Sequence, residues 1–423
     1  MKTMTMAAIS TILLFATMPG LAEQKPSDTQ QAEIEALKAR LAELEEKVNE
    51  AQTKKMSALA MKSSDNRYNP GIGLILTGSA TLIDPDDSEP QPVGFIMPEE
   101  SGLPESGFSI GEAELNLTGN VDDKFYASAT IAFGEGSAEV EEAYLQTLSM
   151  PGDVTLKFGR FLSGAGYLNG RHRHTDDFVQ RPLVYDAFWG GGYGDDGVAA
   201  VWLAPTELFW EIGLEWYRGD AFAAVGGGHR GLGSKALFSH WGGDVGTSHS
   251  WRFGISWFDG HVDTREDLET GAAFLGDNQI IGFDFIWKWA PNGNPTHRNA
   301  KIQLEWFKRK RNGTFTQGTA MVDDEFNDAG GYIQGVYQWT RGWRLGVRYA
   351  FLSPDSTPAP LLGTTFDSGG HDPHRLSVMV DWSNSEYSRL RLQYSRDDST
   401  PTKADVVILQ YTMAFGAHPA HSF

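Results

Sequence analysis

The sequence lacks cysteine, long apolar runs and an excess of positive charge, and each absence excludes a class of protein. With no Cys among 423 residues, the chain has no disulfide framework and no Cys-ligated zinc or iron–sulfur site. No segment approaches the ~20 apolar residues that a membrane-spanning helix needs. A formal net charge of −20 is repelled by phosphate backbones, so we expect no nucleic-acid partner.

Glycine and aromatic residues are plentiful by contrast. The chain has 48 Gly and 12% aromatic residues, while only 40% of its residues are hydrophobic. Length alone would favour two or three globular domains. Many Gly and aromatic residues in a polar chain instead indicate one large antiparallel β structure.

The first residues have the features of a secretory signal peptide. Lys2 gives a positive start, an apolar stretch of 12 residues spans Ala7–Met18, and small residues occupy Gly20 and Ala22. The apolar stretch is too short to cross a bilayer, and small residues at these positions suit cleavage after Ala22. We predict a signal peptide over residues 1–22; the alternative is a buried or anchoring N-terminal helix.

A short coiled-coil segment is predicted over residues 23–56. Apolar residues follow one another there at spacings of 3 and 4 with charged residues between them, which is the a/d pattern of a coiled coil. The residues of this seam are Ile34, Leu37, Leu41, Leu44 and Val48. About three heptads are marginal alone, so we expect the segment to associate with its own copies in the periplasm. The alternative is a surface helix, and residues 57–69 read as a polar linker.

Residues 70–423 alternate between apolar and polar side chains with a period of two. One example is Leu345, Val347 and Tyr349 between Arg344, Gly346 and Arg348. The polar positions carry full charges and the apolar series often end in aromatic residues. This pattern is typical of a transmembrane barrel with a lipid-facing apolar surface and a wet interior. A spanning sheet must close, because open edges leave backbone groups unsatisfied in hydrocarbon.

We therefore predict an all-β fold, a closed antiparallel transmembrane barrel of about 16 strands with ~10 residues per crossing. The expected strand starts are Gly71, Phe108, Asp123, Glu139, Asp153, Gly197, Leu208, Ser234, Ser248, Asn278, Asn299, Gly331, Gly342, His374, Glu386 and Lys403. Residues 84–107, 259–277, 311–330 and 353–372 are expected to be long outer loops. Residues 163–195 lack alternation and are expected to fold inward as a constriction loop, as is usual in barrels that enclose a channel.

The charges expected to line the pore differ between early and late strands. The acidic residues are Glu112, Glu114, Glu142, Glu211 and Glu215; the basic ones are Lys288, Lys301, Arg344, Arg348, Arg389 and Arg391. Opposed charged walls would orient polar solutes, and a basic row would prefer anions. The alternative is that these charges are solvated and set only weak selectivity.

Three fragments and the layout resemble the phosphate-selective porin O and P family. The fragments are residues 108–120 (FSIGEAELNLTGN), 142–145 (EAYL) and 157–161 (KFGRF). The resemblance implies a homotrimer of sixteen-stranded pores, embedded in outer-membrane lipid and carrying small anions. The expected location is the bacterial outer membrane.

A histidine-containing stretch in the constriction loop suits a metal ion. His172 and His174 point the same way in an extended segment, and Asp176 and Asp177 follow. Imidazole with carboxylate suits zinc or another divalent ion, and the chain also resembles outer-membrane proteins described as zinc-regulated. The alternative is a polar loop whose histidines bind nearby carboxylates. We expect no resident cofactor, with zinc as a candidate ligand only.

The sequence thus favours a porin for passive diffusion of small polar or charged solutes, with anions preferred. One alternative is a zinc-responsive uptake channel or receptor, and another is a structural barrel of the envelope. We expect no enzymatic activity, because the chain contains no nucleophile elbow, phosphate-binding loop or metalloprotease motif.

Overall fold

A computed structural model describes residues 70–416, apart from 86–91, 99–102, 135–136, 227–231 and 268–269. The predicted signal peptide, coiled-coil segment and linker lie outside the described residues. The predicted barrel segment, residues 70–423, contains all of the described chain.

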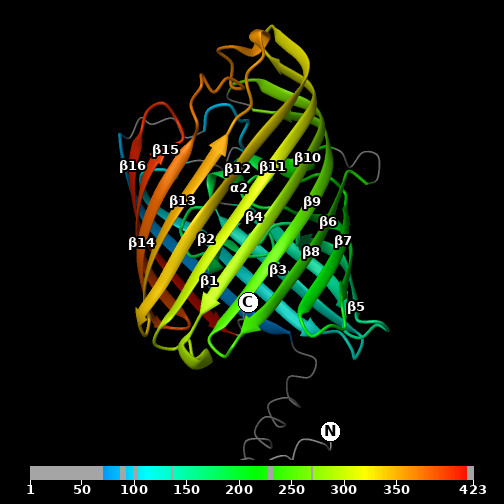
Figure 1. Cartoon of the computed structure of the whole chain (residues 1–423), viewed down its shortest axis with the longest axis vertical. Helices are drawn as coiled ribbons and strands as arrows, with labels where there is room; N and C mark the ends of the chain where they lie inside the picture. Colours follow the sequence, from blue (N-terminus) through cyan, green and yellow to red (C-terminus); the bar gives the residue numbers. More distant parts are fainter. Residues whose placement is uncertain are drawn as a thin grey trace, which may run out of the picture. The chain divides into compact units, whose positions relative to one another are not determined.

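Sixteen antiparallel strands close into a barrel (Figure 1), which confirms the predicted fold class. The strands are β1 (Gly71–Asp84), β2 (Gly107–Asn120), β3 (Phe125–Gly134), β4 (Ser137–Thr147), β5 (Val154–Leu162), β6 (Gly194–Leu203), β7 (Phe209–Tyr217), β8 (Ser234–Val245), β9 (His249–Glu266), β10 (Ala272–Trp289), β11 (Asn299–Gln317), β12 (Ala320–Thr340), β13 (Trp343–Ser353), β14 (His374–Ser385), β15 (Ser388–Asp398) and β16 (Ala404–Gly416). Each strand pairs with its neighbours in sequence, and β1 closes the ring by pairing with β16 from Gly73↔Gly416 to Asp84↔Asp405.

The two faces of the strands have the polarity expected of a membrane barrel. In β13, Val347 and Tyr349 are 46% and 43% exposed, whereas Arg348 between them is 2% exposed. The largest fully buried side chains include four arginines, while Leu, Ile and Phe cover the outside. An apolar exterior around a charged interior is stable when lipid solvates the outside.

Strands β9, β10, β11 and β12 are longer than the sequence predicted. They contain 18, 18, 19 and 21 residues, and they rise above their neighbours at the top of Figure 1. The outer loops expected at 259–277 and 311–330 were therefore wrong, because most of these residues continue the strands. Outside the hydrocarbon, polar residues can stay in a ladder whose hydrogen bonds already satisfy the backbone.

Helical structure in the described chain is short. It comprises α2 (Leu183–Trp189) and the 3₁₀ turns η1 (Arg173–Thr175), η2 (Phe222–Ala224), η4 (Pro291–Gly293) and η5 (Ala359–Leu361). Among these residues no helix has the length and apolarity to cross a membrane.

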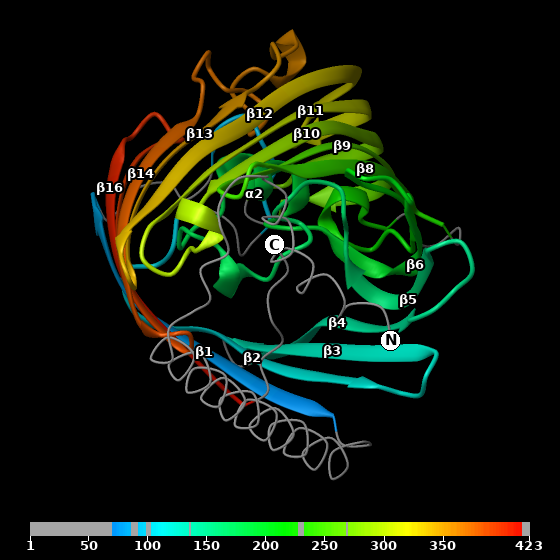
Figure 2. The ribbon, with the colours of Figure 1, turned by 60° about the horizontal axis from the view of Figure 1, so that its bottom comes forward.

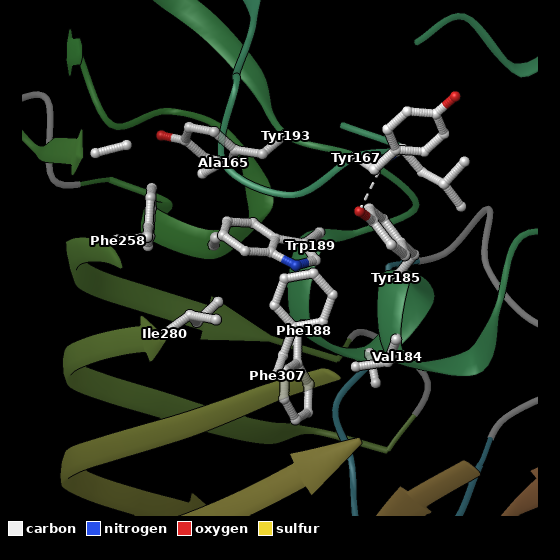
Figure 3. Close-up of a cluster of buried hydrophobic side chains, with 14 of the residues drawn as sticks. Ala165, Tyr167, Val184, Tyr185, Phe188, Trp189, Tyr193, Phe258, Ile280 and Phe307 are labelled. Carbon is white, nitrogen blue, oxygen red and sulfur yellow. Dashed lines mark hydrogen bonds between the residues drawn. The ribbon is translucent and has the colours of Figure 1, made fainter. Parts of the chain in front are cut away.

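Residues 163–193, which connect β5 to β6 and include α2, lie inside the ring of strands (Figure 2). Every residue of α2 is buried, including Asp186, and the others are apolar or aromatic. Trp189 packs edge-on against Phe258 and Phe307 of the wall, with ring centroids 5.2 and 5.8 Å apart (Figure 3). This apolar cluster fixes one end of the inward loop to strands β9 and β11.

Candidate functional site: a loop that bridges the barrel interior

The inward loop begins at a carboxylate on β7. Ser163 Oγ donates a hydrogen bond of 2.6 Å to Glu215, and the backbone N–H of Gly164 donates one of 2.9 Å to the other oxygen of the same carboxylate. Glu215 thus supplies acceptors for two donors at the point where the chain leaves the wall.

A second carboxylate, Glu305 on β11, holds the loop from the other side. It accepts hydrogen bonds from the backbone N–H of Tyr167 and the hydroxyl of Tyr185, both 2.7 Å long, and from the hydroxyl of Tyr332. Tyr167 and Tyr185 belong to the loop and Tyr332 to β12. One buried side chain therefore joins two parts of the loop to two strands.

Two histidines of the loop contact acidic strands. The ring nitrogens of His172 lie 3.2 Å from Glu141 and 3.0 Å from Glu142 on β4, and Nδ1 of His174 lies 2.6 Å from Glu114 on β2. Consecutive strand residues normally point to opposite faces. The register of β3 and β4 shifts at this point, from Thr130↔Glu142 to Ile131↔Val140, so Glu141 is the extra residue of a bulge. Bulges re-aim side chains, and this one lets both carboxylates reach His172.

The carboxylates keep His172 protonated. Burial of the ring lowers its pKa, but the hydrogen bonds to Glu141 and Glu142 outweigh that effect and raise the pKa of His172 to about 10. His172 therefore carries a positive charge at neutral pH and faces the acidic strands as a cation.

Two aspartates further along the loop contact basic residues. Asp177 forms ion pairs with Lys301 on β11 and with Arg344 on β13, the latter at 3.1 Å. Arg389 and Arg391 on β15 donate hydrogen bonds of 2.8 Å to the backbone carbonyls of His174 and Asp176. Burial raises the pKa of Asp177, but the charges of Lys301 and Arg344 outweigh it and hold the pKa well below its usual range.

Residues 171–177, which we call the bridge, therefore connect two walls of opposite charge. From His172 to Asp177 the chain contacts β2 and β4 on one side and β11, β13 and β15 on the other. Six residues span at most ~20 Å even when fully extended. The bridge thus crosses the interior between these strands, and its charges complement those of each wall.

The structure places the predicted pore-lining residues as follows. Four of the basic residues contact the bridge: Lys301, Arg344, Arg389 and Arg391. Lys288 on β10 is the register partner of Lys301. The guanidinium of Arg348 lies over the ring of Phe178 in the loop. Glu114 and Glu142 contact the bridge histidines, Glu215 anchors the start of the loop, and Glu211 pairs with His240 at 2.8 Å. Glu112 is in β2, but its side chain lies outside the described part of the chain.

The four residues proposed for metal binding fall into two pairs. His172 and His174 stack with ring centroids 5.7 Å apart on the acidic side. Asp176 pairs with Arg181 at 3.0 Å, and Asp177 pairs with the basic wall. The carboxylates beside the histidines are instead those of Glu114, Glu141 and Glu142.

Three carboxylates that organise the interior, Asp381, Glu305 and Glu141, were not among the site residues predicted from the sequence. Asp381 on β14 accepts from Arg344 at 2.6 Å and lies 3.4 Å from Arg391. Both Asp381 and Glu305 lie on the inward face set by strand alternation, so counting every second residue from Arg375 along β14 and from Lys301 along β11 would have found them. Glu141 could not be found in this way because the bulge breaks the alternation.

Comparison with protein-family models gives no match. A protein of Aquifex aeolicus (strain VF5), described as uncharacterized, is 30% identical over 391 residues, which cover 85% of this chain and 81% of that protein. The two proteins belong to one family. The relationship to this uncharacterized protein does not indicate an activity.

Solved structures show the same fold. A loop-deletion mutant of OmpT, an outer membrane protein of Vibrio cholerae, matches with a TM-score of 0.51 and 12% identity over 82% of this chain and 99% of that one. An anion-selective porin from Comamonas acidovorans matches with a TM-score of 0.50 and 10% identity, and the match covers 82% of this chain and 99% of that one. With its apolar exterior, the chain is an outer-membrane β-barrel of the porin fold.

Proposed function

We propose that the protein is a channel for passive diffusion of small polar or charged solutes across the outer membrane, and that the bridge forms its constriction. The observation that carries this proposal is the charged, water-compatible interior with an inward loop held to both walls. A barrel of this size encloses an aqueous channel. In the described interior, buried ion pairs such as that of Asp177 with Arg344 hold the loop in place. This use of the charged residues favours a pore over an enzyme.

We further propose that the channel prefers anions. Lys288 and Lys301 are opposite each other on β10 and β11, and Arg344, Arg389 and Arg391 lie on nearby inward positions. Rings or rows of basic side chains favour anions. The resemblance to phosphate-selective porins and the anion selectivity of the Comamonas protein support the same preference, with phosphate as the first solute to test.

Reversal potentials in a salt gradient test this preference. The wild-type channel is expected to pass chloride more readily than potassium, and Lys288→Glu is expected to lower that ratio. Lys308→Glu is the matched control, because it makes the same charge change on β11 at an exposed position on the outer face. Equal shifts in both variants would contradict a selective role for the inner basic row.

We also propose that the barrels form homotrimers through the wall of β1 to β5. The chain has 13 Trp, and apart from Trp189 in α2 all of them lie on strands β6 to β14. Membrane barrels place aromatic girdles where they face lipid. The outer face of β2, β3 and β4 has Phe125 and Phe133 but no Trp, and between them it carries Ala113, Ala127, Ala129 and Ala143. Small residues favour close packing between membrane segments.

A structural barrel of the envelope is the second candidate. Correctly folded protein that carries no current at any voltage would favour it over a channel.

A further inference from the structure

The acidic side of the bridge gathers five metal-ligating side chains from three separate parts of the chain. Glu114 comes from β2, Glu141 and Glu142 from β4, and His172 and His174 from the bridge. One ligand atom each from Glu114, Glu141 and His172 lies within 4.8 Å of the others. A carboxylate oxygen of Glu114 is also 2.6 Å from Nδ1 of His174.

The charge of this cluster favours a cation. Three carboxylates contribute three negative charges, and two imidazoles contribute at most two positive ones. Arg389 lies nearby, and its guanidinium donates a hydrogen bond to the backbone carbonyl of His174. The three proposed ligands are largely buried, with exposed fractions of 3% for Glu114, 18% for His172 and 23% for Glu141. Such a desolvated cluster gains more from a bound ion than an exposed acidic patch does.

The bulge in β4 is the structural feature that assembles the cluster. Without the register shift, Glu141 would point to the outer face and only Glu142 would reach the bridge. Such bulges are common where a strand must re-aim a side chain toward a functional site. The result is a mixed nitrogen and oxygen donor set, which suits Zn²⁺ and similar divalent ions and is poorly matched to Mg²⁺.

We propose that His172, Glu114 and Glu141 form a binding site for a divalent cation of the Zn²⁺ class, with Glu142 and His174 completing its surroundings. Ligands bound tetrahedrally to one Zn²⁺ ion at about 2.1 Å lie ~3.4 Å apart, and Nδ1 of His172 already lies 3.2 Å from Glu141 and 3.8 Å from Glu114. Since the three ligand atoms lie within 4.8 Å of one another, side-chain movements of about an ångström bring them to these separations. A bound ion would replace the proton shared between His172 and its carboxylates and would fasten the bridge to β2 and β4.

Calorimetric titration of the full, detergent-folded protein with Zn²⁺ tests the site. We expect one ion per chain, and we expect His172→Gln and Glu141→Gln each to raise the Kd about tenfold or more. Glu141→Gln keeps the size of the side chain, and heat-modifiable gel migration verifies that both variants are folded. The matched control is His371→Ala with His374→Ala, which removes two histidines that share Asp398 at the surface.

The control pair is expected to leave the Kd unchanged. Wild-type protein that binds no Zn²⁺, or a His172→Gln variant that binds it as tightly as wild type, would overturn the inference. Calorimetry does not require conduction. A barrel that binds Zn²⁺ through these residues but carries no current would therefore contradict the proposed function and leave the metal site standing.

Discussion

Asp177 is the residue on which the basic side of the bridge depends most. It is buried, pairs with Lys301 and Arg344, and accepts a hydrogen bond of 3.0 Å from Gln334. Replacing it with Asn leaves two cations beside a neutral group. Breaking a buried ion pair by removing one partner costs about 3 kcal/mol or more.

We therefore expect Asp177→Asn to lower the free energy of unfolding by about 3 kcal/mol and to increase current noise as the bridge loosens. Denaturant titration and single-channel recording measure the two effects. Asp405→Asn is the control, since it breaks the exposed pair with Arg396, and exposed pairs contribute little. Equal losses in both variants would show that the bridge is not held by Asp177.

The same residue predicts a dependence on pH. The pKa of Asp177 is lower in the folded protein than the ordinary value, so its ion pairs stabilise the fold above the ordinary Asp pKa of about 3.9. That stability is lost only as the pH falls through the folded-state value. The stability difference between wild type and Asp177→Asn should thus stay constant from pH 8 to pH 5, as followed by denaturant titration. A difference that vanished by pH 6 would contradict this assignment.

At the residue scale, strand alternation predicted more than local motif reading did. The period of two assigned Lys301, Arg344 and Arg391 to the interior, and these residues contact the bridge. It could not predict their partners, because Asp177 is 124 positions before Lys301 in a loop without alternation. It also could not predict Glu141, since the bulge interrupts the period of two between Val140 and Ala143.

At the scale of elements, the start of the inward loop depends on Gly166. Its φ is +87°, and a Cβ there would lie 2.8 Å from the hydroxyl of Tyr185 and 3.2 Å from the Glu305 carboxylate. Gly166→Ala is expected to add a steric clash to the ~1 kcal/mol cost of this backbone conformation. We expect it to destabilise the barrel and to change the conductance.

The variant Gly363→Ala separates the steric cost from the cost of the backbone conformation. Gly363 has a φ of +73° but open space where its Cβ would stand, so only the backbone cost applies and the conductance should stay unchanged. Denaturant titration and single-channel recording compare the two variants. Equal effects would show that Tyr185 and Glu305 do not constrain the loop.

The extended strands β9 to β12 form a second element with its own apolar cluster. Near their tips, Phe315 has ring centroids 4.7 Å from Phe274, 4.5 Å from Phe326 and 5.4 Å from Phe366. Phe315→Ala should cost about 3 kcal/mol in denaturant titration while leaving the conductance intact, because the bridge is unaffected. The control is the exposed Met321→Ala at the same tip. A changed conductance in Phe315→Ala alone would mean that the tips contribute to the constriction.

The strands could be predicted from the sequence within the membrane, where lipid requires apolar and polar residues to alternate. The starts of β1, β8, β11 and β14 match the predicted positions, since apolar and polar residues must alternate in lipid. Beyond the hydrocarbon this requirement ends, so polar residues at 259–266 and 320–330 looked like loops although they continue strands. Ladder hydrogen bonds there do not depend on side-chain polarity.

At the scale of the whole molecule, the proposed trimer interface can be tested with paired substitutions. Ala129→Trp places a large side chain on the outer face of β3 and should prevent close packing of barrels, shifting the protein from trimer to monomer. Val347→Trp makes a similar change on the exposed face of β13 and should leave the trimer intact. Cross-linking and native electrophoresis distinguish the species. Trimers that persist in Ala129→Trp would place the interface elsewhere.

Single-channel conductance measured with and without the inward loop tests whether the bridge forms the constriction of a channel. Leu162 and Gly194 are register partners, so a two-residue Asn-Gly turn can replace residues 163–193 and join β5 to β6 as a hairpin. We expect wild type to conduct and the shortened barrel to conduct several-fold more, because the bridge no longer crosses the interior. Equal conductance in the two folded proteins would contradict the bridge as the constriction, and absence of current in both would contradict the channel itself.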